Sequence, residues 1–290
     1  MTGIINQLLI EYFPMHHIIS RLPISSKWHI ALRTIPLVAI VLLIKYIVHN
    51  MGYEILELNS LFTAIISANI FLIGFLISGT LVDYKESEKL PGELSSSLET
   101  MADEAIIIYK QKKSKDAVVF LQKLILFNDL LLDWFHKKIH SDELIRQLQT
   151  FNDDFIALEP QTQANFIVRL KQEQNALRRV VRRIHTIRET SFIGAGYAIA
   201  EIITAILLLG LIIIQMQPFS ESLFFVSFVA FILIYMIYFI KDLDNPFGYY
   251  DKTNLAADVS LFPLEDSKRR LSSYLDEMQS VPKKASAKRK

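Results

Sequence analysis

Cysteine is absent from this 290-residue sequence, and its absence removes several kinds of chemistry. Without a thiol, the chain cannot form a disulfide, use a sulfur nucleophile or bind zinc through cysteine. The sequence also lacks the P-loop, GxSxG, HExxH and paired-carboxylate patterns that mark common enzyme sites. We therefore expect a protein that is not an enzyme and that holds no cofactor.

We also expect no secretory signal peptide among the first residues. The first residues have no basic n-region, and Glu11 and Pro14 interrupt the stretch that would have to be the apolar core. We expect the first membrane span to act as its own signal.

Long apolar runs, in contrast, are abundant. Hydrophobic residues make up 51% of the chain and the mean hydropathy is +0.30, which is too apolar for an ordinary soluble domain. Residues 61–82 contain no ionisable side chain, and about 20 apolar residues suffice to cross a hydrocarbon core roughly 30 Å thick. Predominantly apolar runs, two of which include a few ionisable residues, also occupy residues 30–49, 192–215 and 222–240. The sequence therefore predicts an all-α membrane protein with four transmembrane helices.

Charged stretches separate these runs into five parts. Residues 83–190 carry balanced charges, with apolar positions at helical spacing, and predict a helical cytosolic domain that continues the helix of the second span through residue 94. The five expected parts are an amphipathic interfacial N-terminus (1–29), transmembrane helices 1 and 2 (30–82), the cytosolic helical domain (83–190), transmembrane helices 3 and 4 (191–241), and a cytosolic C-terminal segment with a disordered basic tail (242–290).

One segment of the cytosolic domain, residues 116–135, is apolar enough to be mistaken for a further span. Five polar residues interrupt it too often for that, so we expect a buried core or subunit-interface helix. Downstream, Ser141 predicts the N-cap of one helix, and Pro160 predicts the first position of a long helix that runs towards residue 190. The interrupting residues are Gln122, Lys123, Asn128, Asp129 and Asp133.

An arginine cluster fixes the expected orientation. It directly precedes the third span, and basic residues near span ends mark the cytosolic side. We therefore expect both termini in the cytosol, and a plasma or inner membrane location. Contact with anionic lipid suits the cluster better than nucleic acid, because no aromatic residues are interleaved with it. The cluster comprises Arg178, Arg179, Arg182, Arg183 and Arg188.

Two further polar features have alternative interpretations. Glu201 lies inside the third span, where it would either face the bundle and pair with Arg33, Lys45 or a polar group of span two, or lie partly hydrated near the headgroups. His136 and His140 are four residues apart on a predicted helix that also carries Asp133, which is a possible metal-binding spacing. We favour a polar surface for this group and expect no metal.

Two stretches resemble the bestrophin family of ion channels. IFLIGF (70–75) followed by DYKESEKLPGEL (83–94) is similar to the family's second helix, and DLDNPFG (242–248) is similar to its motif after the last span. The order and spacing of the parts agree over nearly the whole chain. The divergent bestrophin-like domain family of unknown function is the closer match.

The resemblance implies a homopentameric channel that binds permeating ions and lipid. Ser67, Phe71 and Phe75 would line a neck formed by five copies of the second helix, with Ser67 where the family usually has a bulky apolar residue. After Gly248 only Asp251 remains of the acidic run that clasps Ca²⁺ in animal members, so we expect no calcium clasp. The motif residues are Asp242, Asp244, Asn245, Pro246, Phe247 and Gly248.

The permeating ion and the class of function stay open at the level of the sequence. Aromatic edges and juxtamembrane arginines favour anions such as chloride, whereas Glu54 and Glu57 make the outer link acidic. The alternative to a channel is a non-conducting scaffold or signalling adaptor whose cytosolic helices bind a protein partner. A transporter would need repeat halves or broken helices, and the sequence shows no clear ones.

Overall fold

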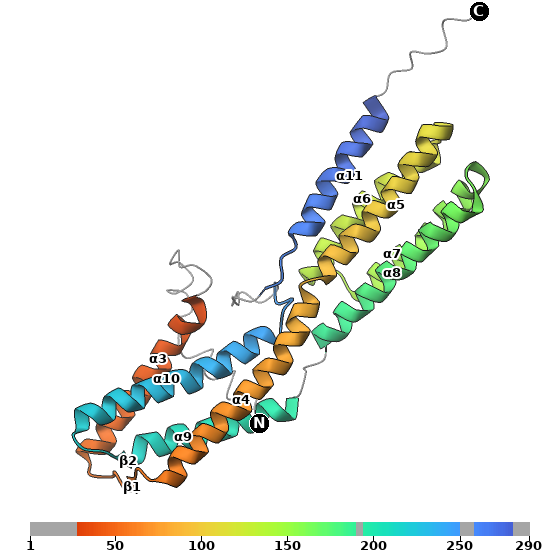
Figure 1. Cartoon of the computed structure of the whole chain (residues 1–290). Helices are drawn as coiled ribbons and strands as arrows, with labels where there is room; N and C mark the ends of the chain where they lie inside the picture. Colours follow the sequence, from red (N-terminus) through yellow and green to blue (C-terminus); the bar gives the residue numbers. More distant parts are fainter. Residues whose placement is uncertain (1–27, 190–193, 250–257, 281–290) are drawn as a thin grey trace, which may run out of the picture.

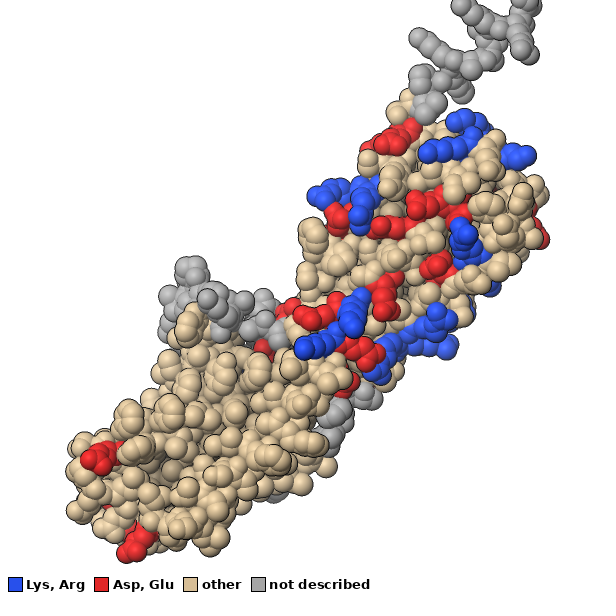
Figure 2. Space-filling view, viewed as in Figure 1, with Lys and Arg blue, Asp and Glu red and all other residues tan. Residues whose placement is uncertain are grey.

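The computed structural model describes residues 28–189, 194–249 and 258–280, and it shows an elongated, almost entirely helical chain (Figure 1). The chain has two regions, an apolar bundle and a charged bundle, joined by α4 (Ser60–Ser87) and α5 (Leu90–Lys112). Lysine, arginine, aspartate and glutamate side chains gather on the second region, whereas the visible surface of the first is almost free of them (Figure 2). This division follows the alternation of apolar and charged stretches in the sequence.

Four helices form the apolar bundle, and each is long and apolar enough to cross a membrane. They cover the four predicted spans, which confirms the all-α membrane fold class. Two short strands, β1 (Leu56–Glu57) and β2 (Ile214–Gln215), pair in parallel at the distal end of the bundle, which is the end far from the charged region. The helices are α3 (His29–Asn50), α4 (Ser60–Ser87), α9 (Gly194–Ile213) and α10 (Phe219–Leu243).

The charged region is a second helical bundle. Its central helix is α6, whose apolar face is buried against α5, α7 and α11, so the prediction of a buried core helix is confirmed. Phe120 and Phe127 of α6 meet the ring of Phe151 edge-on, at centroid distances of 5.7 and 5.2 Å. The helices are α5 (Leu90–Lys112), α6 (Lys115–Phe135), α7 (Ser141–Leu158), α8 (Ala164–Glu189) and α11 (Phe262–Ser280), with a 3-10 turn, η2 (Glu159–Gln161), before α8.

The junction between α4 and α5 differs slightly from the predicted continuous helix. α4 ends at Ser87 and α5 begins at Leu90, so the helix is interrupted for two residues. Pro91 explains the interruption, because proline has no backbone N–H to donate and is best accommodated in the first turn of a helix. Glu88 and Lys89 keep helical backbone angles, so the path is nearly continuous.

Both predicted helix starts in the charged region were misplaced. His140, not Ser141, stands at the N-cap of α7, and no side chain caps that helix. The Ser141 hydroxyl instead accepts a hydrogen bond from the indole of Trp134 at 3.0 Å, a tertiary contact that the local pattern did not indicate. Pro160 lies in η2, and α8 begins only at Ala164.

The C-terminal segment contains a packed helix that the sequence analysis missed. Leu264, Leu271 and Met278 of α11 recur every seven residues and are buried against α5 and α6. The Met278 carbonyl accepts a hydrogen bond from Tyr109 at 2.6 Å. The expected interfacial N-terminal helix and the basic tail at 281–290 lie outside the described residues.

Candidate functional site

The outward face of α4 carries the three predicted neck residues. Phe71 and Phe75 are 78% and 66% exposed, and Ser67 is exposed on the same side of the helix. The Ser67 hydroxyl donates to the carbonyl of Thr63 at 3.0 Å, one turn earlier, so part of its hydrogen-bonding capacity is used within the helix. The chain's own helices therefore leave this stripe uncovered.

Small residues extend the uncovered face. Ala64, Ala68, Gly74 and Ser78 are all exposed. A side-chain carbon added at Gly74 would meet no atom within 4 Å, so nothing within one chain requires a glycine there. Only 17% of the most apolar window of α4 is buried, compared with 28% in each of the other three candidate spans. Of these four helices, α4 is the one least covered by its own chain.

The opposite face of α4 attaches it to the bundle. Asn69 is buried and donates to the Thr204 hydroxyl of α9 at 3.0 Å. One turn beyond Phe75, the Thr80 hydroxyl lies 3.1 Å from that of Tyr197, which in turn donates to Asp244 at 2.8 Å. Because the fixed face is opposite the stripe, packing within the chain orients Ser67, Phe71 and Phe75 outward.

The predicted post-span motif closes α10 and ties it to the charged bundle. Phe247 is fully buried, with its ring 5.6 Å from that of Phe135 at the end of α6. The Pro246 carbonyl accepts a hydrogen bond from the amide of Val259 at 2.9 Å. Gly248 packs against Asn245. A side-chain carbon added at the glycine would lie only 3.0 Å from the side-chain nitrogen of Asn245, so there is little room for a larger residue. The motif is therefore a structural joint.

The two acidic residues of the motif are placed differently. Asp242 is buried at the end of α10, and Asp244 accepts the bond from Tyr197 described above. Asp251, the remaining acidic residue considered for calcium, lies outside the described residues. In the part of the chain that the structure describes, no three His, Asp or Glu side chains converge as metal ligands.

Comparisons with known proteins identify this arrangement. Neither protein-family profiles nor curated protein sequences match the chain. Among solved structures, one mutant of a bacterial bestrophin homologue from Klebsiella pneumoniae matches with a TM-score of 0.67 at 14% identity, over 84% of this chain and 98% of that chain. A second mutant of the same homologue matches with a TM-score of 0.64 at 16% identity, over 89% of this chain and 100% of that chain. The chain has the bestrophin fold. A further crystal structure of the homologue gives a TM-score of 0.62 at 14% identity, over 87% of this chain and 97% of that chain.

The bestrophin fold and the four apolar helices fit an integral membrane protein. The resemblance inferred from two short motifs is thereby confirmed at the level of the fold. The match covers nearly the whole length of both chains, so both the apolar and the charged regions belong to the shared architecture.

Within the bestrophin fold, Glu201 has a different partner from those predicted. It pairs with Lys241 of α10 at 2.7 Å, and both side chains are more than one-third exposed. The predicted partners are engaged elsewhere: the Arg33 guanidinium lies 5.1 Å above the ring of Tyr238, and Lys45 binds Glu54. The predicted pairing with Arg33 or Lys45 is therefore wrong, because spacing along one helix cannot show that the end of α10 lies beside the first half of α9. The partial exposure of Glu201 agrees with the other alternative, a partly hydrated side chain.

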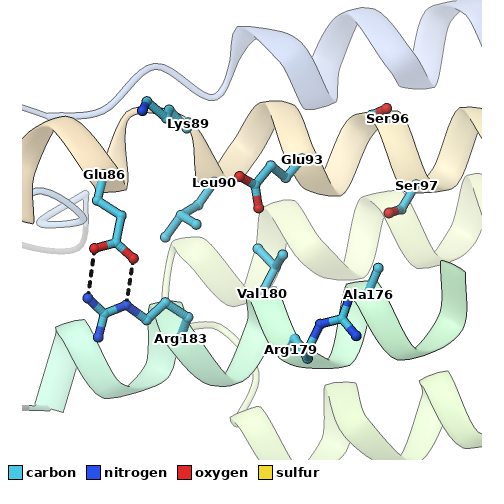
Figure 3. A pocket seen from close by; sticks show the side chains of 10 residues that line it. All are labelled: Glu86, Lys89, Leu90, Glu93, Ser96, Ser97, Ala176, Arg179, Val180 and Arg183. Carbon is cyan, nitrogen blue, oxygen red and sulfur yellow. Dashed lines mark hydrogen bonds and ion pairs between the residues drawn. The ribbon is translucent and has the colours of Figure 1, made fainter. Parts of the chain in front are cut away.

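The arginine cluster lies on α8, and the structure separates its members. Arg183 forms two 2.8 Å bonds with Glu86 at the end of α4, while Arg178 is half-buried and Arg182 is exposed. The bonds from Arg183 hold the pKa of the Glu86 carboxyl below its usual value, and the carboxylate raises the pKa of Arg183. Arg179 lines an open cleft of about 440 Å³ between α5 and α8 (Figure 3).

The histidine pair is not on one helix. α6 ends at Phe135, His136 follows it, and His140 stands at the start of α7. The His136 ring nitrogen contacts the Leu132 carbonyl at 2.7 Å, which is a local contact at the helix end. The predicted helical spacing was therefore wrong, because the turn at Lys137, with φ of 54°, separates the two histidines.

Proposed function

We propose that this protein is an ion channel in which five copies surround a central pore lined by α4. The observation that carries the proposal is the uncovered face of α4, in a chain with the bestrophin fold. Large aromatic side chains and small residues share that face, which suits a helix that lines a passage and packs against copies of itself.

The neck would consist of rings of Phe71 and Phe75, with a ring of Ser67 before them. Residues four apart on a helix are separated by about 6 Å along its axis, so the three rings would form a short, stepped constriction. Phenylalanine rings would exclude water and set the barrier, whereas the Ser67 hydroxyls would keep their level wetter. Permeation needs no bond making, so we infer no enzymatic activity.

Chloride is the ion that we propose for this pore. The edges of the phenylalanine rings carry partial positive charge, and Arg179 and Arg182 add positive charge on the exposed surface of α8. The argument against anions was the acidic link between the first two spans. In the structure, Lys45 compensates the charge of Glu54, so Glu57 is the carboxylate of this link that stays exposed. Reversal potentials in asymmetric KCl test this choice, and a shift towards the potassium equilibrium potential would contradict it.

We propose that the charged region and both termini face the cytosol, in a plasma or inner membrane, with anionic lipid near the arginines. Calcium should not be required, because Asp244 is already engaged by Tyr197 and hard cations need several oxygen ligands. A steep dependence of the current on calcium would contradict this part of the proposal.

Two measurements test the proposal as a whole. The first is the number of copies per complex in detergent or lipid, where five supports a central pore. The second is chloride flux from liposomes that contain the purified protein. A monomer or dimer without flux would instead favour a scaffold or signalling adaptor whose cytosolic helices bind a partner.

A further inference from the structure

A buried ionic cluster lies at the distal end of the apolar bundle. The Lys45 side chain is completely buried, and its Nζ donates to Glu54 Oε1 at 2.6 Å and also to the carbonyl of Ile214. The second carboxylate oxygen of Glu54 lies 2.9 Å from Nδ1 of His49. Both oxygens of this nearly buried carboxylate are therefore engaged by α3.

The cluster joins the end of α3 and the link that follows it to β2, which is far away in the sequence. A buried ammonium group is tolerated only where a carboxylate or carbonyl compensates it, so Lys45 specifies where Glu54 and Ile214 must lie. Directly after Glu54, the amide of Ile55 donates to the carbonyl of Ile213 at 3.1 Å, and Leu56 pairs with Ile214. The link between α3 and α4 is thus held against β2 over several consecutive residues.

The same link ends at the first turn of α4. The Asn59 side chain caps the helix by accepting a hydrogen bond from the Phe62 amide at 2.8 Å. The Phe62 ring packs against Gly210 of α9. A side-chain carbon added at Gly210 would lie only 2.6 Å from the ring, so this close contact requires the glycine. The start of α4 is therefore fixed by the link on one side and by α9 on the other.

We propose that Lys45 is a positioning residue for the pore helix: through Glu54 it holds the start of α4 and thereby sets where the phenylalanine rings of the neck stand. The proposal rests on the channel function proposed above. Phe71 lies nine residues after Phe62, roughly 14 Å along a rigid helix, so a tilt at the distal end displaces it. Misaligned rings exclude water less well, and the flux rises.

Glu54 gives the cluster a dependence on pH. The ionisable groups that face it are Lys45 and His49 of α3, while β2 contributes the Ile214 carbonyl and α10 contributes Phe219, whose ring stacks on His49 at 3.7 Å. Burial alone would raise the pKa of Glu54, but hydrogen bonds from Lys45 and His49 lower it below its usual value of 4.5. The cluster is therefore intact at neutral pH and is lost as pH falls below that value.

The central test substitutes Lys45→Met, which keeps an unbranched side chain but removes the charge. We expect the chloride flux of proteoliposomes to rise, and the amides of the first turn of α4 to lose about 100-fold in hydrogen-exchange protection. The Glu57→Gln variant, which changes an exposed carboxylate of the same link, should behave as wild type. Acidification below pH 4.5 on the distal side should raise wild-type flux and leave the flux of Lys45→Met unchanged.

Two further variants separate positioning from general damage. The Phe71→Ala variant already has a widened neck, so adding Lys45→Met to it should raise the flux no further. If Lys45→Met instead caused a leak through misfolding, the leak would add to the flux of Phe71→Ala. The double variant Lys45→Met/Glu54→Leu replaces the pair by apolar side chains and should restore wild-type flux and protection. If Lys45→Met does not fold, Glu54→Gln makes the same test.

The outcomes distinguish this proposal from the channel itself. A wild-type protein that conducts, with a Lys45→Met variant identical to it in flux and exchange, overturns the positioning role. Failure of the double variant to restore flux also overturns it. A wild-type protein without flux overturns the channel function instead, and the exchange measurement then still shows whether Lys45 holds the start of α4.

Discussion

Replacing the neck phenylalanines by alanine should raise ion flux while leaving the fold almost unchanged. Truncating a buried phenylalanine typically costs about 3–5 kcal/mol, because packing contacts are lost and a cavity is left. Phe71 and Phe75 are 78% and 66% exposed in the chain, so they keep only a quarter to a third of such contacts. We therefore expect each single substitution to cost roughly 1 kcal/mol or slightly more within one chain.

The effect on permeation should be much larger than the effect on stability. If the rings form the barrier, shortening them lets water fill the neck, and a barrier lower by about 1.4 kcal/mol raises the rate roughly tenfold. Chloride flux from proteoliposomes and single-channel recording measure this directly. Each variant should keep the oligomer number and the melting temperature of the wild type within a few degrees.

A matched control comes from α10. Phe228 is 58% exposed and lies on a helix that we do not place around the pore, so Phe228→Ala makes the same chemical change elsewhere in the bundle. We expect wild-type flux from this variant. If Phe71→Ala and Phe75→Ala both leave the flux unchanged, or if Phe228→Ala raises it equally, the assignment of the pore to α4 is wrong.

Four other predictions follow from the packing and from one ion pair. Gly74→Leu should leave a single chain folded, because that position is open, but should reduce the pentamer fraction seen by native mass spectrometry; an undisturbed pentamer would exclude close α4 contacts there. Gly210→Ala should instead lower the melting temperature, because the new carbon meets the Phe62 ring, and an unchanged melting temperature would contradict that packing. Phe247→Ala should cost about 3–5 kcal/mol in chemical unfolding, and a cost below 1 kcal/mol would show that the motif is not a joint of the two regions. Glu86→Gln should lower stability by less than about 1 kcal/mol at neutral pH, because this ion pair is exposed. The pKa of Glu86 is lowered in the folded state, so its contribution is lost as pH falls below 4.5, and melting curves of variant and wild type should converge there.

The sequence by itself determined the helices and the fold class. Hydropathy located four spans because crossing a membrane requires a long uninterrupted apolar run, and α3, α4, α9 and α10 fall where those runs are. Charge interruptions in residues 116–135 were enough to exclude a fifth span, and α6 is indeed a core helix of the charged region. Two short motifs in the right order also indicated the bestrophin fold. These features depend on local composition and order, which a sequence contains directly.

Only the tertiary structure showed which charged residues pair and which helices pack together. Glu201 binds Lys241 and not Arg33, because the packing of α9 against α10 brings together residues that spacing cannot relate. Buried Lys45 binds Glu54, because the link after α3 turns back towards that helix. α11 also escaped prediction, since its three buried apolar residues define a face only when α5 and α6 are beside it. Sequence and tertiary structure together determine the outward direction of Ser67, Phe71 and Phe75. Helical period placed them on one stripe, but the burial of the opposite face of α4 is what turned that stripe away from the chain.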